Sequence, residues 1–396
     1  MRRSPLLPIF LIVLVDVLGL TIIIPLLAIY SERFGASPLV ASLLIPSYAV
    51  CQLVAGPILG SLSDRVGRRR VLILSQFGTL LGFIILARAD ALWMLFLGRV
   101  LDGATAGNLT VAQAYIADHT PPEKRASSFA LIGIAFGLGF TVGPAISAAL
   151  AGYGLAAPFW LAAGLSALSI LGTTFLLPKD PPRTPAPGEA KRPSVFDLGA
   201  YARYFRTPVL GRRLVQFFVY MCAFSMFTGG FALYAERHLV WDGHFFTVRE
   251  IGFTFALSGV IGAVIQGGFI RRLVPRFGEA AIASAGFLAF AAGYVLLGAS
   301  AAIAVLAAAT VLSAMGNAVL RPCLTALISR LADPREQGAV LGVTQSLSSV
   351  AAVAAPPLAG FLIGHDLGRE WTLVAAGFAV LGFLIMPRAN PRPAAT

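Results

Sequence analysis

Long apolar runs separated by short polar breaks limit the fold of this sequence more than any other feature. Twelve runs can be traced, near residues 6–30, 38–60, 71–88, 92–117, 126–152, 156–177, 209–235, 247–270, 279–299, 301–329, 337–363 and 371–387. A helix that crosses a bilayer needs about 20 predominantly apolar residues. The runs therefore predict an all-α polytopic membrane protein with 12 transmembrane helices, which leaves no room for a sizeable soluble domain.

The charges of the chain support a membrane location. Charged residues make up 12% of the sequence, whereas soluble domains carry about 25%. The net charge of +12 comes from basic residues scattered between the apolar runs, so the predicted partner is the lipid bilayer and no nucleic acid is expected. Lys and Arg number 23 on the amino terminus, the even-numbered connections and the carboxyl terminus, against 5 on the other side. The positive-inside rule then predicts that both termini are cytoplasmic.

A Pro-rich, charged stretch divides the runs into two sets of six. Residues 178–208 are predicted to be a cytoplasmic linker, because clustered prolines cannot sustain a buried helix. The flanking six-helix bundles would then cover residues 1–177 and 209–396. An internal repeat supports this division, since Gly67 pairs with Gly278 at a spacing of 211 residues and Pro144 with Pro356 at 212. Two equivalent halves are typical of secondary transporters.

The connection between the second and third runs carries the most specific string, GSLSDRVGRRR at residues 60–70. Gly67 permits a tight reversal, the arginines would hold the connection at the cytoplasmic face, and Asp64 can face a basic partner. From the residues alone, a plain positive-inside connection is an alternative. The string resembles the signature loop of the major facilitator superfamily. This resemblance implies a conformational latch between the halves formed by Gly60, Asp64, Arg65, Gly67, Arg68, Arg69 and Asp118. The latch would be one-sided, because the equivalent position in the second half is Pro275 and carries no acid.

Two further segments extend the resemblance. Residues 97–103, around Arg99, resemble the buried-arginine motif of the family, and residues 137–144 resemble its glycine-proline antiporter motif, which is associated with export. Gly139 and Gly143 allow close helix approach and Pro144 can bend the helix, although ordinary packing would use the same residues.

Over nearly the whole chain, the sequence is most similar to the tetracycline/proton antiporters of the drug/proton antiporter family. This implies the major facilitator fold, with 12 helices in two pseudo-symmetric six-helix halves. Those antiporters have acids in spans three and nine, where this sequence has Gly82 and Phe290. Tetracycline itself is therefore not the expected substrate.

Four charged residues lie well inside the apolar runs, namely Asp16, Arg99, Asp102 and Arg321. Each such charge costs at least ~2.5 kcal/mol at a helix centre and needs a partner or a wet cavity. Arg99 and Asp102, three residues apart, share a helix face. They could form a permanent ion pair, or a pair that breaks intermittently and lets Asp102 bind a proton. Asp102, Asp16 and Arg99 are the predicted proton-coupling residues.

The resemblance places the first, fourth, seventh and tenth runs around a central cavity, and we predict a substrate site there. Asp16 could bind the cationic part of a substrate or only join neighbouring helices, and Arg321 could bind an anionic group or neutralise Asp16. A stripe on the seventh run offers a lipophilic surface or ordinary core packing. The predicted substrate-binding residues are Asp16, Arg321, Asn317, Gln52, Phe217, Tyr220, Met221 and Phe224.

These features predict a proton-coupled antiporter that exports lipophilic drug-like small molecules by alternating access, as a functional monomer in a bacterial inner membrane. A proton-coupled metabolite importer is one alternative. A transport-inactive membrane sensor or scaffold is another, although it would have no use for costly intramembrane charges. The sequence shows no metal-ligand cluster, phosphate loop or nucleophile triad, so we expect no enzyme, metal or cofactor.

Overall fold

The computed structural model describes residues 6–120, 125–178, 198–332 and 337–386. These residues form helices joined by short connections, with a single two-stranded hairpin in the described chain. The elements are α1 (Leu6–Glu32), α2 (Pro38–Ser42), α3 (Leu44–Val66), α4 (Arg68–Ala87), α5 (Leu92–Ala104), α6 (Asn108–His119), α7 (Arg125–Ala151), α8 (Ala157–Leu176), α9 (Leu198–Arg206), α10 (Pro208–His238), β1 (Val240–Trp241), β2 (His244–Phe245), α11 (Val248–Val264), the π-helical η2 (Ile265–Phe269), α12 (Ile270–Ala299), α13 (Ile303–Leu331), α14 (Gln337–Gly364) and α15 (Gly368–Leu384). The all-α polytopic prediction is confirmed.

Ten helical stretches in the described chain are long and apolar enough to cross a membrane. The predicted fourth span is instead built from α5 and α6, which are separated by residues 105–107. The predicted twelfth span is α15, which has 17 residues. With these two, the helices account for the twelve predicted spans.

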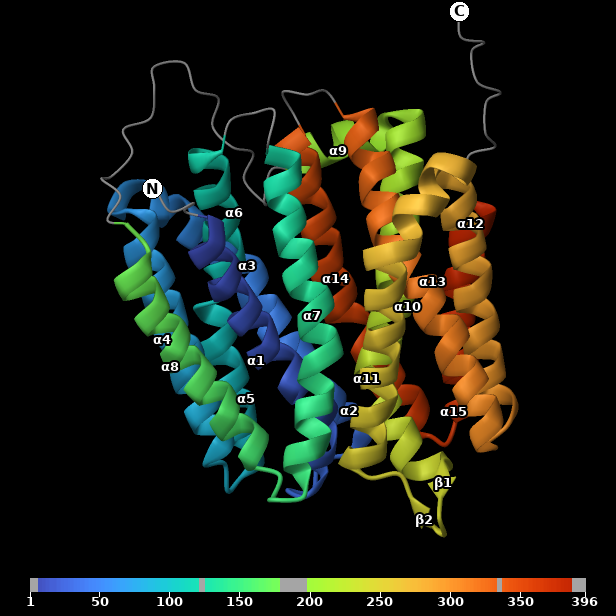
Figure 1. Cartoon of the computed structure of the whole chain (residues 1–396). Coiled ribbons are helices and arrows are strands. Elements are labelled where there is room, and N and C mark those ends of the chain that lie inside the picture. The colour runs from blue at the N-terminus through green and yellow to red at the C-terminus, as the bar shows by residue number, and fades with distance from the viewer. Residues whose placement is uncertain (1–5, 121–124, 179–197, 333–336, 387–396) are drawn as a thin grey trace, which may run out of the picture.

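The first helix begins and the last helix ends at the same end of the bundle (Figure 1). We call this the terminal end, and the opposite end, which carries β1 and β2, the hairpin end. The strands are joined by Asp242 and Gly243, which have φ of 50° and 80°. Positive φ at both turn residues suits the twist of a two-residue hairpin, and Asp-Gly is a favoured pair for it.

Each half of the chain builds its own apolar core. Two clusters come almost entirely from α1 to α8, and a third comes mainly from α9 to α15. The packing repeats between the halves, since α1 lies against α7 in the first half and α10 lies against α14 in the second. Ala28, Ala36 and Ala41 of the first half join the second-half cluster. These three residues lie near the hairpin end, so the two cores merge there.

The halves meet along α7 with α11 and along α2 and α3 with α14. Glycines make these contacts close. A Cβ atom on Gly252 would lie 2.7 Å from the Cβ of Ala148, and one on Gly259 would lie 2.3 Å from the Cα of Thr141. Small residues at helix interfaces allow backbones to approach in this way.

Three connections differ in extent from the sequence-based boundaries. Helix α3 continues to Val66, so the connection to α4 is the single residue Gly67, with φ of 105°. The equivalent Gly278 has φ of 78° and interrupts the helical path within α12. Both glycines therefore make the predicted reversal. The predicted linker contains a helix, α9, near its end, whereas residues 179–197 lie outside the described chain.

Candidate functional site

The centre of the first half holds a buried ion pair. Arg99 and Asp102 on α5 are 2% and 5% exposed, and their Nη1 and Oδ2 atoms are 3.1 Å apart. The guanidinium of Arg99 also lies over the ring of Tyr48, 4.3 Å from its centroid. Tyr48 in turn accepts a hydrogen bond of 2.9 Å from the side chain of Gln52. The predicted pair is thus formed, and Gln52 reaches it through Tyr48.

The helix that carries this pair breaks just beyond it. Residues 105–107 separate α5 from α6, and the Thr105 hydroxyl donates to the carbonyl of Leu101 at 2.9 Å. Thr105 also packs against α4, because a Cβ atom on Gly78 would lie 2.0 Å from its hydroxyl oxygen. Broken helices of this kind are tolerated inside a membrane only where protein or a cavity surrounds them.

Asp16 on α1 lies near the same pair. The hydroxyl of Ser169 on α8 donates to its Oδ1 at 3.4 Å, Oδ2 is buried, and the side chain of Asn108 on α6 lies beside the carboxyl group. Asp102 is a charged neighbour of Asp16, and the Thr79 hydroxyl lies beside Asp102. The cluster therefore contains two carboxyl groups and one guanidinium. Arg321 forms no ion pair with Asp16, so the predicted alternative of mutual neutralisation is not observed.

Gly82, which the resemblance aligns with an acid of the antiporters, packs directly against this cluster. A Cβ atom on Gly82 would lie 2.9 Å from the carbonyl oxygen of Gly98 and 3.1 Å from the Cβ of Asp102. No acidic side chain fits there without moving α4 and α5 apart. The backbone and Cβ of Asp102 thus border the space that a side chain at position 82 would enter.

Phe290, the second position that the resemblance aligns with an acid, belongs to the aromatic core of the second half. Its ring lies 6.0 Å from that of Tyr220 and 4.7 Å from that of Tyr294. Phe217, Tyr220 and Met221 are 3%, 1% and 4% exposed in the same core cluster. The stripe on α10 is therefore largely core packing in this conformation. Phe224 is the half-buried member, and its ring lies 6.0 Å from that of Phe140 in the other half.

Arg321 on α13 is half-buried. Its guanidinium carbon lies 5.1 Å from the ring centre of Phe136 on α7, so the contact crosses between the halves. Asn317, one turn earlier on α13, accepts a 2.6 Å hydrogen bond from the Tyr220 hydroxyl. Two predicted substrate residues on α13 thus lie beside one from α10.

The predicted latch residues are joined within the first half. Arg68 contacts Asp64 on α3, and its Nη2 lies 2.9 Å from Oδ2 of Asp118 on α6. Arg69 donates to the carbonyl of Thr174 on α8. A Cβ atom on Gly60 would lie 3.1 Å from the Thr110 side chain. Arg65 is exposed beside this network, which joins α3, α4, α6 and α8 near the terminal end.

The second half has an ion pair at the same place with reversed charges. Glu279 follows Gly278 as Arg68 follows Gly67, and Arg330 corresponds to Asp118 at the 212-residue spacing. Oε1 of Glu279 and Nη2 of Arg330 are 2.5 Å apart. The sequence repeat could have revealed this pair, but the change of sign conceals it.

The glycines of the antiporter motif bring α7 against α1. A Cβ atom on Gly139 would lie 2.5 Å from the Val17 side chain, and one on Gly143 would lie 2.1 Å from the Thr21 hydroxyl. That hydroxyl donates to the carbonyl of Gly139 at 2.8 Å. The predicted close approach is confirmed. On the far side of α7, the carbonyl of Pro144 lies against Gly252 of α11, so this segment also forms part of the contact between the halves.

An ion pair that the sequence did not predict joins the halves at the hairpin end. Nη2 of Arg237, near the end of α10, lies 2.6 Å from Oε1 of Glu32, the last residue of α1. Gly360 of α14 packs nearby against Ser42 and Pro38. The two halves are thus held together by polar and close apolar contacts at this end.

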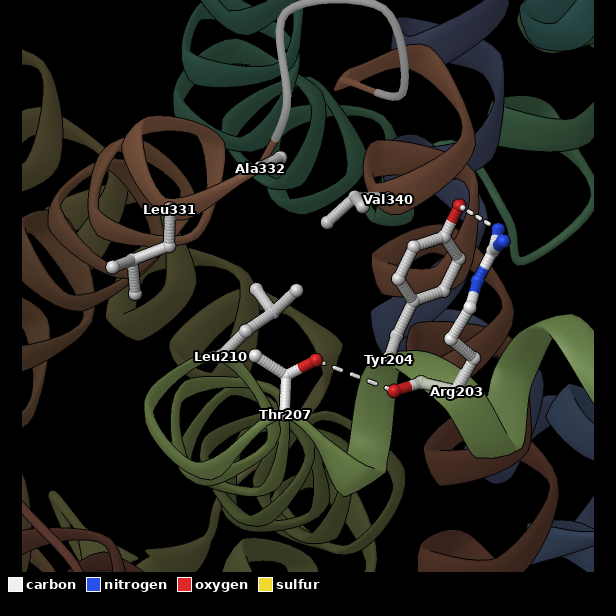
Figure 2. A pocket seen from close by; sticks show the side chains of 7 residues that line it. All are labelled: Arg203, Tyr204, Thr207, Leu210, Leu331, Ala332 and Val340. Carbon is white, nitrogen blue, oxygen red and sulfur yellow. Dashed lines mark hydrogen bonds between the residues drawn. The ribbon is translucent and has the colours of Figure 1, made fainter.

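A pocket of about 210 Å³ lies where α9, α10, α13 and α14 meet. Figure 2 shows Tyr204, Thr207 and Arg203 at its edge, with Arg203 donating to the Tyr204 hydroxyl. None of the predicted site residues lines it, so it is separate from the charge cluster and from Arg321.

Comparison with known proteins identifies the family. The profile described as Major Facilitator Superfamily matches residues 9–278 and 247–395. The chain is 30% identical to the class E tetracycline resistance protein of Escherichia coli over 96% of its length and 94% of the relative's. Identity to the class D tetracycline resistance protein of Salmonella ordonez is also 30%, over 97% of each chain.

The crystal structure of the human organic anion transporter MFSD10 has the same fold, with a TM-score of 0.74 at 24% identity, over 97% of this chain and 99% of that one. The predicted major facilitator fold is thereby confirmed, and the chain is a multi-pass membrane transport protein, not an enzyme. The predicted resemblance to the tetracycline antiporters is likewise confirmed, and the chain belongs to the major facilitator superfamily.

Proposed function

We propose that the protein is a proton-coupled antiporter that exports lipophilic, drug-like small molecules. The similarity over nearly the full chain to tetracycline resistance proteins supports export of a small molecule. The close packing at Gly82 supports a substrate other than tetracycline. The two halves, divided near residues 178–208, move as the units of alternating access.

The observation that carries the proposal is the charge count in the first-half cluster. The cluster holds two carboxyl groups, those of Asp102 and of its neighbour Asp16, but one guanidinium, that of Arg99, which is paired with Asp102. With both carboxylates ionised the buried cluster would carry a net negative charge, which is costly inside the membrane. One exchangeable proton balances the cluster. Asp102 is the proton carrier, with Arg99 controlling its charge and Asp16 sharing the proton.

The contacts between the halves support an alternating cycle. The Arg237–Glu32 ion pair and the packing of Gly360 close the hairpin end. By the distribution of basic residues the terminal end faces the cytoplasm of a bacterial cell, so this conformation is closed toward the outside. On opening outward, Asp64 and its neighbours around Gly67 latch the halves at the terminal end. One monomer suffices for the cycle.

Transport by the purified protein in proteoliposomes tests the proposal. A pH gradient should drive the movement of rhodamine 123 against its concentration gradient, and a proton uncoupler should abolish it. The Asp366→Asn variant removes an exposed carboxyl group on the connection before α15 and should behave like the parent. Dye movement that is unaffected by the uncoupler would rule out proton coupling, and movement driven in the same direction as the protons would indicate an importer.

A further inference from the structure

We propose that Arg321 forms a subsite for the anionic group of the transported molecule, so that the preferred substrates are lipophilic organic anions. This inference deepens the proposed function and rests on its claim that small molecules bind between the halves. It concerns the charge of the ligand and holds for either direction of transport.

Within the described residues, Arg321 has no carboxylate at ion-pair distance. In the described chain, Arg99, Arg68, Arg237 and Arg330 each lie within ion-pair distance of a carboxylate. The guanidinium of Arg321 lies over the face of the Phe136 ring and is a charged neighbour of the Tyr220 hydroxyl. It follows Ile303 by 18 residues and precedes Leu331 by 10, so it lies about 15 Å inside the nearer end of α13. A cation at this depth needs an anion or water.

The neighbouring polar groups leave mainly donors available. The Tyr220 hydroxyl donates its hydrogen bond to Oδ1 of Asn317 at 2.6 Å. The amide nitrogen of Asn317 therefore remains as a donor, one turn from Arg321 on the same face of α13. A guanidinium and an amide N–H₂ side by side suit a carboxylate or a sulfonate, whose oxygens only accept hydrogen bonds.

The surrounding surface suits an apolar body attached to that anion. Phe136 and Phe140 on α7 lie one turn apart, and Phe140 contacts the half-buried Phe224 of α10. These rings belong to both halves, so a flat aromatic ligand between them would contact both. An aromatic ring with one acidic substituent would satisfy the rings and Arg321 together.

Binding of two matched dyes to the purified full-length protein tests the inference. Fluorescein and rhodamine 123 share a xanthene ring system but carry opposite charges, and fluorescence anisotropy measures the affinity of each. The parent protein should bind fluorescein more tightly. Arg321→Gln should weaken fluorescein binding by about tenfold or more, because it removes a charged hydrogen-bond donor. Arg321→Lys should lose less, and rhodamine 123 should bind at least as well as before.

Two further variants keep the result unambiguous. Asn317→Asp places a carboxylate one turn from Arg321, where it should occupy the guanidinium and abolish fluorescein binding in a folded protein. Arg212→Gln removes an exposed cation of α10 and should change neither affinity. The inference is wrong if the parent does not bind fluorescein, if Arg321→Gln leaves its affinity within about twofold, or if both dyes lose affinity equally. Anion binding without proton-driven transport would instead contradict only the proposed function.

Discussion

The two halves repeat one helical arrangement but place their buried charges differently. In the first half the guanidinium of Arg99 contacts the carboxylate of Asp102, with Asp16 nearby, whereas in the second half the guanidinium of Arg321 lies over the ring of Phe136 with no carboxylate at ion-pair distance in the described chain. The glycine reversals at Gly67 and Gly278 show that the backbone symmetry is kept. In the functions proposed above, the first half would exchange the proton and the second half would hold the charged ligand.

The ion pairs beside these two glycines, near the terminal end, also differ in charge between the halves. Arg68–Asp118 and Glu279–Arg330 occupy equivalent places with opposite polarity. The arginines differ in environment, because Arg68 is 4% exposed and contacts two carboxylates, whereas Arg330 is 68% exposed and contacts one. The residue beside the glycine is buried in both halves, and the two pairs differ mainly in the exposure of the partner, 19% for Asp118 and 68% for Arg330.

Removal of the titrating group in the first half should have the largest effect. Asp102→Asn keeps the shape of the side chain but cannot carry a proton, so pH-driven transport of rhodamine 123 should fall by at least ~100-fold. Dye binding should persist, since the amide still fills its place. Proteoliposome transport beside Asp366→Asn measures the change. Parental transport by Asp102→Asn would move the proton site elsewhere, with Asp16 the next candidate.

The sequence predicted the members of this cluster because charges stand out in apolar runs. It did not predict the break at residues 105–107, although Gly103 precedes it and Gly107 ends it, because isolated glycines are common in transmembrane helices. Ser169 and Thr79, which lie beside the carboxyl groups, carry no such signal. Their roles depend on how α4 and α8 pack against α1 and α5.

Arg68→Ala should have the next largest effect, which is a loss of stability. It leaves Asp64 and Asp118 near one another without the cation that joins α3 and α6 to α4. Because the guanidinium is almost fully buried, the free energy of unfolding should fall by about 3 kcal/mol. Denaturant unfolding in detergent measures it. A change below about 1 kcal/mol would show that this network contributes no more than a surface pair.

The sequence could not resolve which face of a helix is buried at the centre of the bundle. The spacing of Phe217, Tyr220 and Met221 is that of a helix stripe, which fits a ligand surface and a core equally well. The structure buries all three and leaves Phe224 at the contact between the halves. The Arg237–Glu32 pair was hidden for a related reason, since it joins residues 205 positions apart near the ends of two spans.

Arg237→Ala should shift the balance between conformations by a smaller amount. It removes the ion pair that joins the halves at the hairpin end and leaves Glu32 near Glu236. A partly exposed pair contributes about 1 kcal/mol, so the population open at this end should rise roughly fivefold. Spin labels at positions 37 and 365, in a background without Cys51, Cys222 and Cys323, report the distance by pulsed electron paramagnetic resonance. Arg249→Ala, at an exposed position of the same end, is the control; equal distance distributions in the two variants would exclude a gating role for the pair.

Arg330→Ala should have the smallest effect. The exposed guanidinium of Arg330 loses little water on pairing, but its removal leaves the buried Glu279 without its cation, so it should cost somewhat less than about 1 kcal/mol of unfolding free energy. The same denaturant experiment compares it directly with Arg68→Ala. The exchange of Glu279→Arg with Arg330→Glu gives the second half the polarity of the first at the same exposure, and it should leave the stability within about 0.5 kcal/mol of the parent. If burial determines the difference between the two pairs, removal of the arginine from the swapped pair should still lower the free energy of unfolding by less than Arg68→Ala does. A loss of unfolding free energy as large as that of Arg68→Ala would mean that the sign of the charge beside the glycine, and not its burial, determines the strength of the pair.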